Sequence, residues 1–249
     1  MTLISVERMK LFSTRSPWWC IVVALGLAIG FAALFTSQLG GEMPTSVAMT
    51  QQGNQFGLIV VMVMAALAVT TEYRFGTIRA TFQAMPNRVA VMLAKTAVVA
   101  ALALLIGELA AFGSWGMGWV FAPDQSLALD TAAEWRQVAG PGLVFAGAAV
   151  FALAVGILVR QTAGAVTLVM IWALLAESLI QLIPTIGDDI YEWLPFAAAF
   201  RFMSGGGNSP MSQPLSEMPI GPWPSLVYFL AIAFGLLVVS LVTVHKRDA

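Results

Sequence analysis

Two acidic residues inside apolar segments are the first candidates for chemistry. Glu108 and Glu177 each lie well within a long run of apolar residues. An Asp-like charge at the centre of a bilayer costs roughly 2.5–3.5 kcal/mol on insertion scales, so acids at such depths commonly serve a transport pathway or bind a neighbouring helix. Two interpretations are open. One or both acids face a translocation pathway, near its outer gate or a cationic substrate, or each is a protonated carboxyl group hydrogen-bonded between helices.

The sequence contains few other residues suited to catalysis or cofactor binding. His245 is the only histidine and lies beside Lys246 and Arg247, which argues against histidine-based metal or proton chemistry inside a membrane. The motif G-x-x-x-x-G-K-[ST] does not occur, so the chain cannot itself cradle nucleotide phosphates in a Walker A loop. We therefore expect no catalytic residue, no metal site and no cofactor bound by this chain.

The composition is that of a membrane protein. Of the 249 residues, 59% are apolar and only 10% are charged, whereas soluble domains carry about 25% charged residues. A helix crosses the roughly 30 Å hydrocarbon core with about 20 apolar residues. We predict an all-α membrane protein that forms a single transmembrane domain over residues 1–249, with no nucleic-acid partner. Its six predicted spans are residues 17–36, 55–71, 96–121, 141–159, 162–183 and 225–244.

The distribution of Lys and Arg predicts the orientation of these spans. If the N-terminus is inside, the inner segments hold ten basic residues and the outer segments hold only Arg136 and Arg201. Cytoplasmic loops carry an excess of Lys and Arg, so both termini are predicted to be cytoplasmic. The ten inner residues are Arg8, Lys10, Arg15, Arg74, Arg79, Arg88, Lys95, Arg160, Lys246 and Arg247.

The inner connection over residues 72–95 is unusually charged for this chain, with five charged residues. Within it, apolar side chains recur at i, i+3, i+7 and i+10, which predicts a short amphipathic helix with a narrow apolar stripe. Pro86 ends the pattern, because proline cannot continue a helix with its own N–H. The stripe either lies in the membrane interface or inserts into a groove of a partner protein. Its members are Phe75, Ile78, Phe82 and Met85.

Two segments of the sequence are similar to a known family. The run E-Y-R-F-G-T-I-R, followed by a proline, Arg88 and Lys95, resembles the first cytoplasmic loop of ABC type-2 exporter permeases. The N-terminal V-E-R-M-K-L-F-S-T-R-S-P-W-W is similar to the start of many such permeases in high-GC Gram-positive bacteria. Six spans with a long outer segment before the last one are the half-transporter layout of this family, so the resemblance covers the whole chain. The motifs indicate the superfamily and not the substrate.

The resemblance implies an ABCG-like fold and a role for each matching position. In the family this loop is the coupling helix, which docks on a separate ATP-binding-cassette ATPase. The N-terminal segment 1–16 would be an interfacial connecting helix. ATP and Mg would belong to the ATPase, and a second permease subunit, a copy or a paralogue, would complete the unit. The positions implied for coupling are Glu72, Arg74, Gly76, Thr77, Arg79 and Arg88 with the stripe residues as anchors, and those implied for further ATPase contact are Glu7, Lys10, Arg15 and Arg160.

The outer segment 184–224 is long for a plain connection. The resemblance implies short re-entrant or interfacial helices here, which close the exit of the cavity. We expect a permease in a bacterial plasma membrane that exports a hydrophobic or amphipathic molecule such as a drug, antibiotic, lipid or peptide. The alternatives are an ATP-independent secondary carrier, a membrane-embedded enzyme or another multi-span membrane protein.

Overall fold

The computed structural model describes residues 2–39, 45–123, 127–184, 186–205 and 219–246. Within these ranges the chain is helical and has no strand, and six helical segments are long and apolar enough to cross a membrane. The prediction of an all-α membrane protein with six span-length helices is confirmed. These segments are α2 (Ser16–Leu39), α3 with α4 (Val47–Thr50 and Asn54–Arg74), α6 (Arg88–Phe121), α8 (Pro141–Val159), α9 with η1 and α10 (Thr162–Ile171, Trp172–Ala176 and Glu177–Gln181) and α13 (Pro222–Lys246).

Five further helices lie outside these spans in the described ranges. They are α1 (Leu3–Phe12), α5 (Thr77–Ala84), α7 (Ala132–Ala139), α11 (Gly187–Tyr191) and α12 (Pro195–Ser204). Two of them, α11 and α12, lie in the segment for which short outer helices were expected. Residues 185 and 206–218 of that segment, and Arg247, lie outside the described residues.

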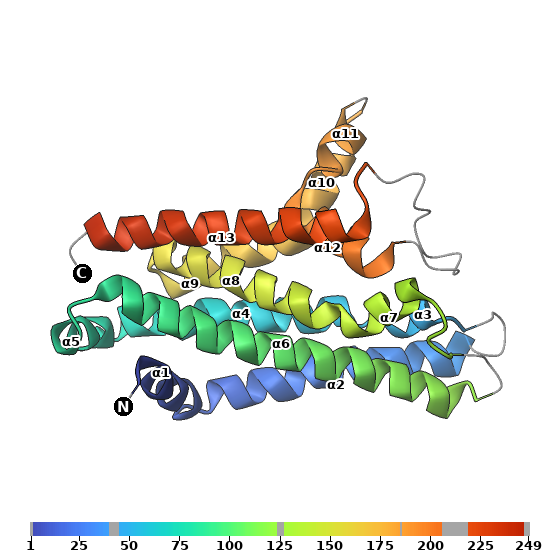
Figure 1. Ribbon diagram of the computed structural model, residues 1–249, viewed down its shortest axis with the longest axis horizontal. Helices are drawn as coiled ribbons and strands as arrows, with labels where there is room; N and C mark the ends of the chain where they lie inside the picture. Colours follow the sequence, from blue (N-terminus) through green and yellow to red (C-terminus); the bar gives the residue numbers. More distant parts are fainter. Residues whose placement is uncertain (1, 40–44, 124–126, 185, 206–218, 247–249) are drawn as a thin grey trace.

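Helix α8 is the centre of the bundle. It packs against α4, α6, α9 and α13, and most of it is buried, whereas α2 and α13 present broad apolar faces outward (Figure 1). Exposed side chains such as Val23 of α2 and Val238 of α13 belong to these outer faces. In water such a surface would be unstable, but lipid tails solvate it.

Small residues let α8 approach its neighbours closely. A Cβ atom added to Gly107 of α6 would lie 2.8 Å from the Cα atom of Gly142 in α8. On the other side of α8, a Cβ atom added to Gly156 would lie 2.7 Å from Val69 of α4. Apolar burial does not drive helix association inside a bilayer, so close van der Waals contact between backbones is the main source of attraction.

The two ends of the bundle differ in the short helices they carry. Helices α1 and α5 lie at one end, together with the last turn of α13, and both run across the long axis of the bundle (Figure 1). We call this the α5 end. Helices α3, α7 and α12 lie at the opposite end, from which α10 and α11 lean away from the bundle. With 34 residues, α6 is about 51 Å long and exceeds the bilayer core of about 30 Å.

The two basic residues at the opposite end are held inside the protein. The guanidinium of Arg136 donates to the carbonyl oxygen of Phe202 at 2.9 Å and to that of Gly205, at the C-terminal end of α12. Arg201 donates to the carbonyl oxygen of Glu192. Cations are favoured near helix C-termini, where carbonyl groups lack partners within the helix. Arg136 and Arg201, the two basic residues that depart from the charge bias, therefore each complete the hydrogen bonding of a helix end.

We predict that Gly107→Ala destabilises the protein, because the added methyl group meets the Gly142 backbone and the Phe145 ring. Overpacking of this kind typically costs about 1–3 kcal/mol. The control is Gly116→Ala in the same helix, where a Cβ atom would have nothing within 4 Å. Thermal unfolding of both variants in detergent should show a lower melting temperature for the first alone. Equal melting temperatures would contradict close α6–α8 packing.

Candidate functional site

The connection between α4 and α5 depends on Gly76. This residue has φ +71°, a left-handed conformation that only glycine adopts without strain, and it directly precedes the first residue of α5, Thr77. The helix therefore covers Thr77–Ala84 and not the whole of residues 75–85. Phe75 caps the end of α4, and Met85 follows α5 in an extended conformation.

The predicted apolar stripe is divided by this geometry. Ile78 and Phe82, one helical turn apart, are buried in the core of the chain itself, while Phe75 is 71% and Met85 39% exposed. The interpretation that the whole stripe is an anchor for the membrane or for a partner is therefore wrong for Ile78 and Phe82. The prediction failed there because it continued a single helix across Gly76, whereas α4 ends at Arg74 and α5 begins at Thr77. A partner can reach Phe75, Met85 and the polar side of α5.

Four charged side chains form a buried network under α5. Lys95 of α6 donates to Glu7 of α1 at 2.5 Å and to Glu72 of α4 at 2.7 Å. Lys10 donates to Glu7 at 2.8 Å and to the hydroxyl oxygen of Thr81 in α5 at 3.1 Å, and its ammonium nitrogen lies 3.8 Å from Glu72. We call Glu7, Lys10, Glu72 and Lys95 the charge cluster. It has no net charge and joins α1, α4, α5 and α6.

The charge cluster explains why α1 has no apolar face. Glu7 is the buried residue of this helix and is only 3% exposed. The helix is therefore held by ion pairs instead of by a stripe of large apolar side chains, with Leu3 and Leu11 partly buried beside it. In the described chain the carboxylate of Glu7 is directed inward, to the lysines. Lys10 is about one-third exposed, and its expected contact with an ATPase stays a prediction.

Two further basic residues at the α5 end are positioned over aromatic rings. Arg74 lies 5.5 Å from the ring centroid of Phe75, and Arg88 lies 5.4 Å from that of Phe82. Such contacts hold a guanidinium close to the protein surface while leaving its charge in place. Arg15 and Arg79 are exposed, and their expected contact with an ATPase stays a prediction.

Arg160 has a constrained backbone in the turn between α8 and α9. It caps α8 with φ +58°, which is uncommon for a residue other than glycine. Its guanidinium lies 5.3 Å from the ring centroid of Tyr73, near the end of α4. This contact fastens the turn between α8 and α9 to the end of α4, the helix that carries Glu72.

Both intramembrane acids are placed at helix N-termini. Glu177 accepts hydrogen bonds from the backbone N–H groups of Phe196 at 2.9 Å and Ala197 at 2.7 Å, and from the indole of Trp172 at 3.2 Å. It thus caps α12. Glu108 contacts Gly142 in the first turn of α8 and hydrogen-bonds to its backbone. Helix N-termini favour a carboxylate because their first N–H groups are unpaired. The proposed pathway role of these acids stays a prediction.

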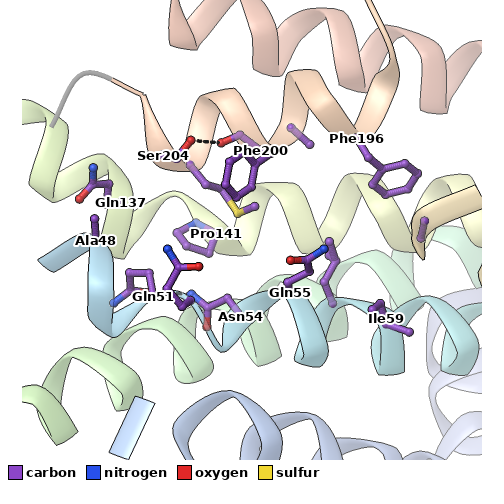
Figure 2. A pocket seen from close by; sticks show the side chains of 15 residues that line it. Ala48, Gln51, Asn54, Gln55, Ile59, Gln137, Pro141, Phe196, Phe200 and Ser204 are labelled. Carbon is purple, nitrogen blue, oxygen red and sulfur yellow. Dashed lines mark hydrogen bonds between the residues drawn. The ribbon is translucent and has the colours of Figure 1, made fainter. Parts of the chain in front are cut away.

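The opposite end of the bundle contains a pocket rich in amide side chains (Figure 2). It encloses about 90 Å³ between the start of α4, α7, α8 and α12. Gln51, Asn54 and Gln137 lie near Pro141 on one side, with Phe200 on the other. Asn54 and Gln137 are both almost fully buried. The pocket is uncharged, and Glu108 and Glu177 are not among the described residues that line it.

Sequence reasoning missed this pocket and the pairing inside the charge cluster. The run Q-Q-G-N-Q at residues 51–55 is a polar interruption at the start of a span and could have indicated the pocket. For the cluster, the available signal was that Glu7 and Glu72 are acids in segments whose other charged residues are basic. No group of His, Cys, Asp or Glu among the described residues is arranged to hold a metal ion.

We predict that Lys95→Met destabilises the protein by about 3–5 kcal/mol, because Glu7 and Glu72 would lose their shared buried partner. Lys246→Met is the matched control, since Lys246 is exposed at the same end. Only Lys95→Met should show a lower melting temperature and faster cleavage by trypsin within α1. If both variants behave like the parent protein, the cluster does not hold α1.

Acid should release α1. Burial alone would raise the pKa of Glu7, but the ammonium groups of Lys95 and Lys10 outweigh it and hold the pKa below the usual value of 4.5. The carboxylate therefore stabilises the folded state above pH 4.5, and this stabilisation is lost as the pH falls through the lower folded pKa.

A nitroxide on Ile4→Cys, in a Cys20→Ser background, should become more mobile once the pH falls below 4.5 and through the lowered pKa of Glu7. In Glu7→Gln the label should be mobile already at neutral pH. A label that stays immobile in acid in the parent protein would contradict the role of Glu7.

No protein-family model and no curated protein matches this chain.

Proposed function

We propose that the chain is the permease subunit of an ATP-driven ABC type-2 exporter in a bacterial plasma membrane. The observation that carries this proposal is the geometry of α5. This helix lies across the end of a six-helix bundle, exposes one face, and is fastened to the spans by Ile78, Phe82 and the charge cluster. A segment that is exposed on one side and rigidly attached on the other suits the transfer of motion from a partner.

The charge pattern supports the proposed orientation. In this proposal the α5 end is cytoplasmic, and both termini lie on that side. The basic side chains of α1, α5 and the start of α6 gather at this end, whereas Arg136 and Arg201 at the opposite end are engaged with backbone carbonyls. The excess of basic residues on one side is the pattern expected of cytoplasmic segments.

The exposed surface of α5 suits a partner with a groove that is apolar and acidic. Phe75 and Met85 offer apolar contacts, and Arg74 and Arg79 offer positive charge. The chain lacks a Walker A motif, so the proposed partner is a separate ATPase that binds ATP and Mg. A second permease subunit, a copy or a paralogue, would complete the transport unit.

The proposed mechanism is mechanical. When two ATPases close on ATP, they push α5 across the end of the bundle. Because Glu72 and Lys95 connect the ends of α4 and α6 at 2.7 Å, this push moves both spans together and carries α1 with them. The bundle would then alternate between inward-open and outward-open forms. A hydrophobic or amphipathic molecule leaving at the far side would pass the neutral amide pocket.

A secondary carrier is less well supported. Such carriers commonly have a pair of spans broken near the middle of the membrane, at corresponding positions in two repeats. Here the fifth span changes to a π-helical segment at Trp172–Ala176. Its counterpart, the second span, is interrupted only between α3 and α4. Because α4 alone has 21 residues, or about 32 Å, that break lies at the membrane surface.

We predict that Arg79→Glu abolishes ATPase docking while leaving the permease folded, because Arg79 is exposed on α5. The tagged chain, purified from its native membranes, should bring with it a polypeptide that contains a Walker A motif and hydrolyses ATP. The control is Arg8→Glu, the same charge reversal at an exposed residue of α1, and this variant should retain that polypeptide. Phe82→Asp is unsuitable as a test because it would place a charge in the core.

The proposal would be contradicted if the purified complex contains no Walker A protein. It would also fail if Arg79→Glu and Arg8→Glu retain the ATPase equally.

A further inference from the structure

One face of α2 is exposed over the first three turns of the helix. Its exposed side chains recur at i, i+1, i+4, i+5 and i+9, which is the spacing of a single helical face. They are Trp18, Trp19, Val22, Val23 and Leu27. Ala24 and Ala28, on the opposite side of the helix, are fully buried in the bundle. Because α2 is long and apolar enough to cross a membrane, its exposed face is the one that lipid contacts.

Arg15 continues this exposed face beyond the start of α2. It precedes Ser16, the first residue of the helix, but its carbonyl oxygen accepts a hydrogen bond from the backbone N–H of Trp19 at 3.2 Å, as in a helix. Arg15 therefore lies one helical turn before Trp18 and Trp19, and all three residues are exposed. Tryptophan favours the boundary between lipid tails and water, where its apolar body and its polar N–H are both solvated. The side chain of Arg15 thus lies at the depth of the lipid head groups.

A ring contact brings α1 to the same place. Phe12, the last residue of α1, has its ring centroid 5.3 Å from that of Trp18. Arg8 precedes Phe12 by four residues, or about 6 Å along α1, and Arg15 precedes Trp18 by three. Each arginine is therefore about one helical turn from one ring of this pair, at the α5 end where α1 and α2 meet (Figure 1). We call the following residues the elbow: Arg8, Phe12, Arg15, Trp18 and Trp19.

The two positive charges of the elbow are not paired within the described chain. The guanidinium groups of Arg8 and Arg15 have no ion pair, hydrogen bond or ring contact with another described residue. Arg74 and Arg88, by contrast, lie over aromatic rings. The acid nearest to the elbow in the sequence, Glu7, is buried and directed to the lysines of the charge cluster. The elbow is therefore complementary to an anion.

We infer that the elbow binds the head group of an anionic phospholipid in the leaflet at the α5 end. Both arginines donate to the phosphate oxygens, and the acyl chains lie along Val22 and Val23. Arginine suits this role because its planar set of N–H donors matches a phosphate group. A zwitterionic phospholipid binds less well, since it adds a cation that the elbow has no exposed acid to pair with.

The apolar face of α2 favours a lipid over other anionic partners. A soluble anion would use the arginines alone and gain nothing from the tryptophans and valines beside them. A soluble ATPase does not reach a face that lies within a span, so the position of Arg15 suits a lipid better than the ATPase contact expected from the sequence. The inference requires neither an ATPase nor transport and is independent of the proposed function.

The test is native mass spectrometry of the purified chain with phosphatidylglycerol and phosphatidylcholine, which carry identical acyl chains and are added at equal concentration. We expect one phosphatidylglycerol per chain to bind at least about tenfold more tightly than phosphatidylcholine. An excess of inorganic phosphate, at constant ionic strength, should not displace it. Equal binding of the two lipids, or displacement by inorganic phosphate, would show that the inference is wrong.

Single charge removals locate the site. Arg8→Gln and Arg15→Gln should each reduce the preference for phosphatidylglycerol about fivefold, because each removes one cation beside the anionic head group. Lys246→Gln is the matched control, since it removes one exposed charge at the same end and should leave the preference unchanged. An equal reduction in all three variants would indicate a general effect of net charge and contradict a defined site.

The same variants separate the lipid from the ATPase. The ATPase that is expected to co-purify with the chain should be retained by Arg15→Gln. Loss of the ATPase with an unchanged lipid preference would assign Arg15 to the ATPase and overturn the inference. Absence of any ATPase from the purified parent complex would contradict the proposed function and not this inference.

Discussion

The hydrocarbon core of a bilayer contains no water to hydrogen-bond to a buried polar group, and this constraint accounts for how four charged residues within or beside the spans are placed. Glu108 and Glu177 are placed at the N-termini of α8 and α12, where backbone N–H groups need acceptors. Arg136 and Arg201 donate to backbone carbonyl oxygens. In each case a side chain that is costly in lipid completes the hydrogen bonding of the backbone. The chain can therefore carry these charges within or beside its spans.

The charged groups of the charge cluster at the α5 end also have hydrogen-bond partners, but there the partners are other side chains. Two acids and two lysines from three helices neutralise one another, and Thr81 adds a contact with α5. Such an arrangement contributes less to stability than an apolar core of the same size, yet it is strongly destabilising to break. It therefore makes the relative positions of α1, α4, α5 and α6 interdependent. This interdependence is what a segment needs if it is to pass motion from a partner to the spans.

The two ends of the bundle differ in the polar groups that line their hollows. The cavity between α1, α4, α5 and α6 is lined at the α5 end by the charge cluster, whereas the pocket at the opposite end is lined by neutral amides. The first lining contains charged groups, and the second contains groups that only hydrogen-bond.

The sequence by itself determined the class, the number of spans and the basic bias, because these depend on composition and on the length of apolar runs. The predicted span at residues 141–159 agrees with α8, since Pro141 begins the helix and Arg160 ends it. Only the tertiary structure decided the roles of single residues. The left-handed Gly76 ended the helical period, so that Phe75 became exposed while Ile78 and Phe82 became buried. Likewise, Glu7 and Lys95 are 88 positions apart, and no local pattern can predict their pairing, because it depends on how α1 folds back against α6.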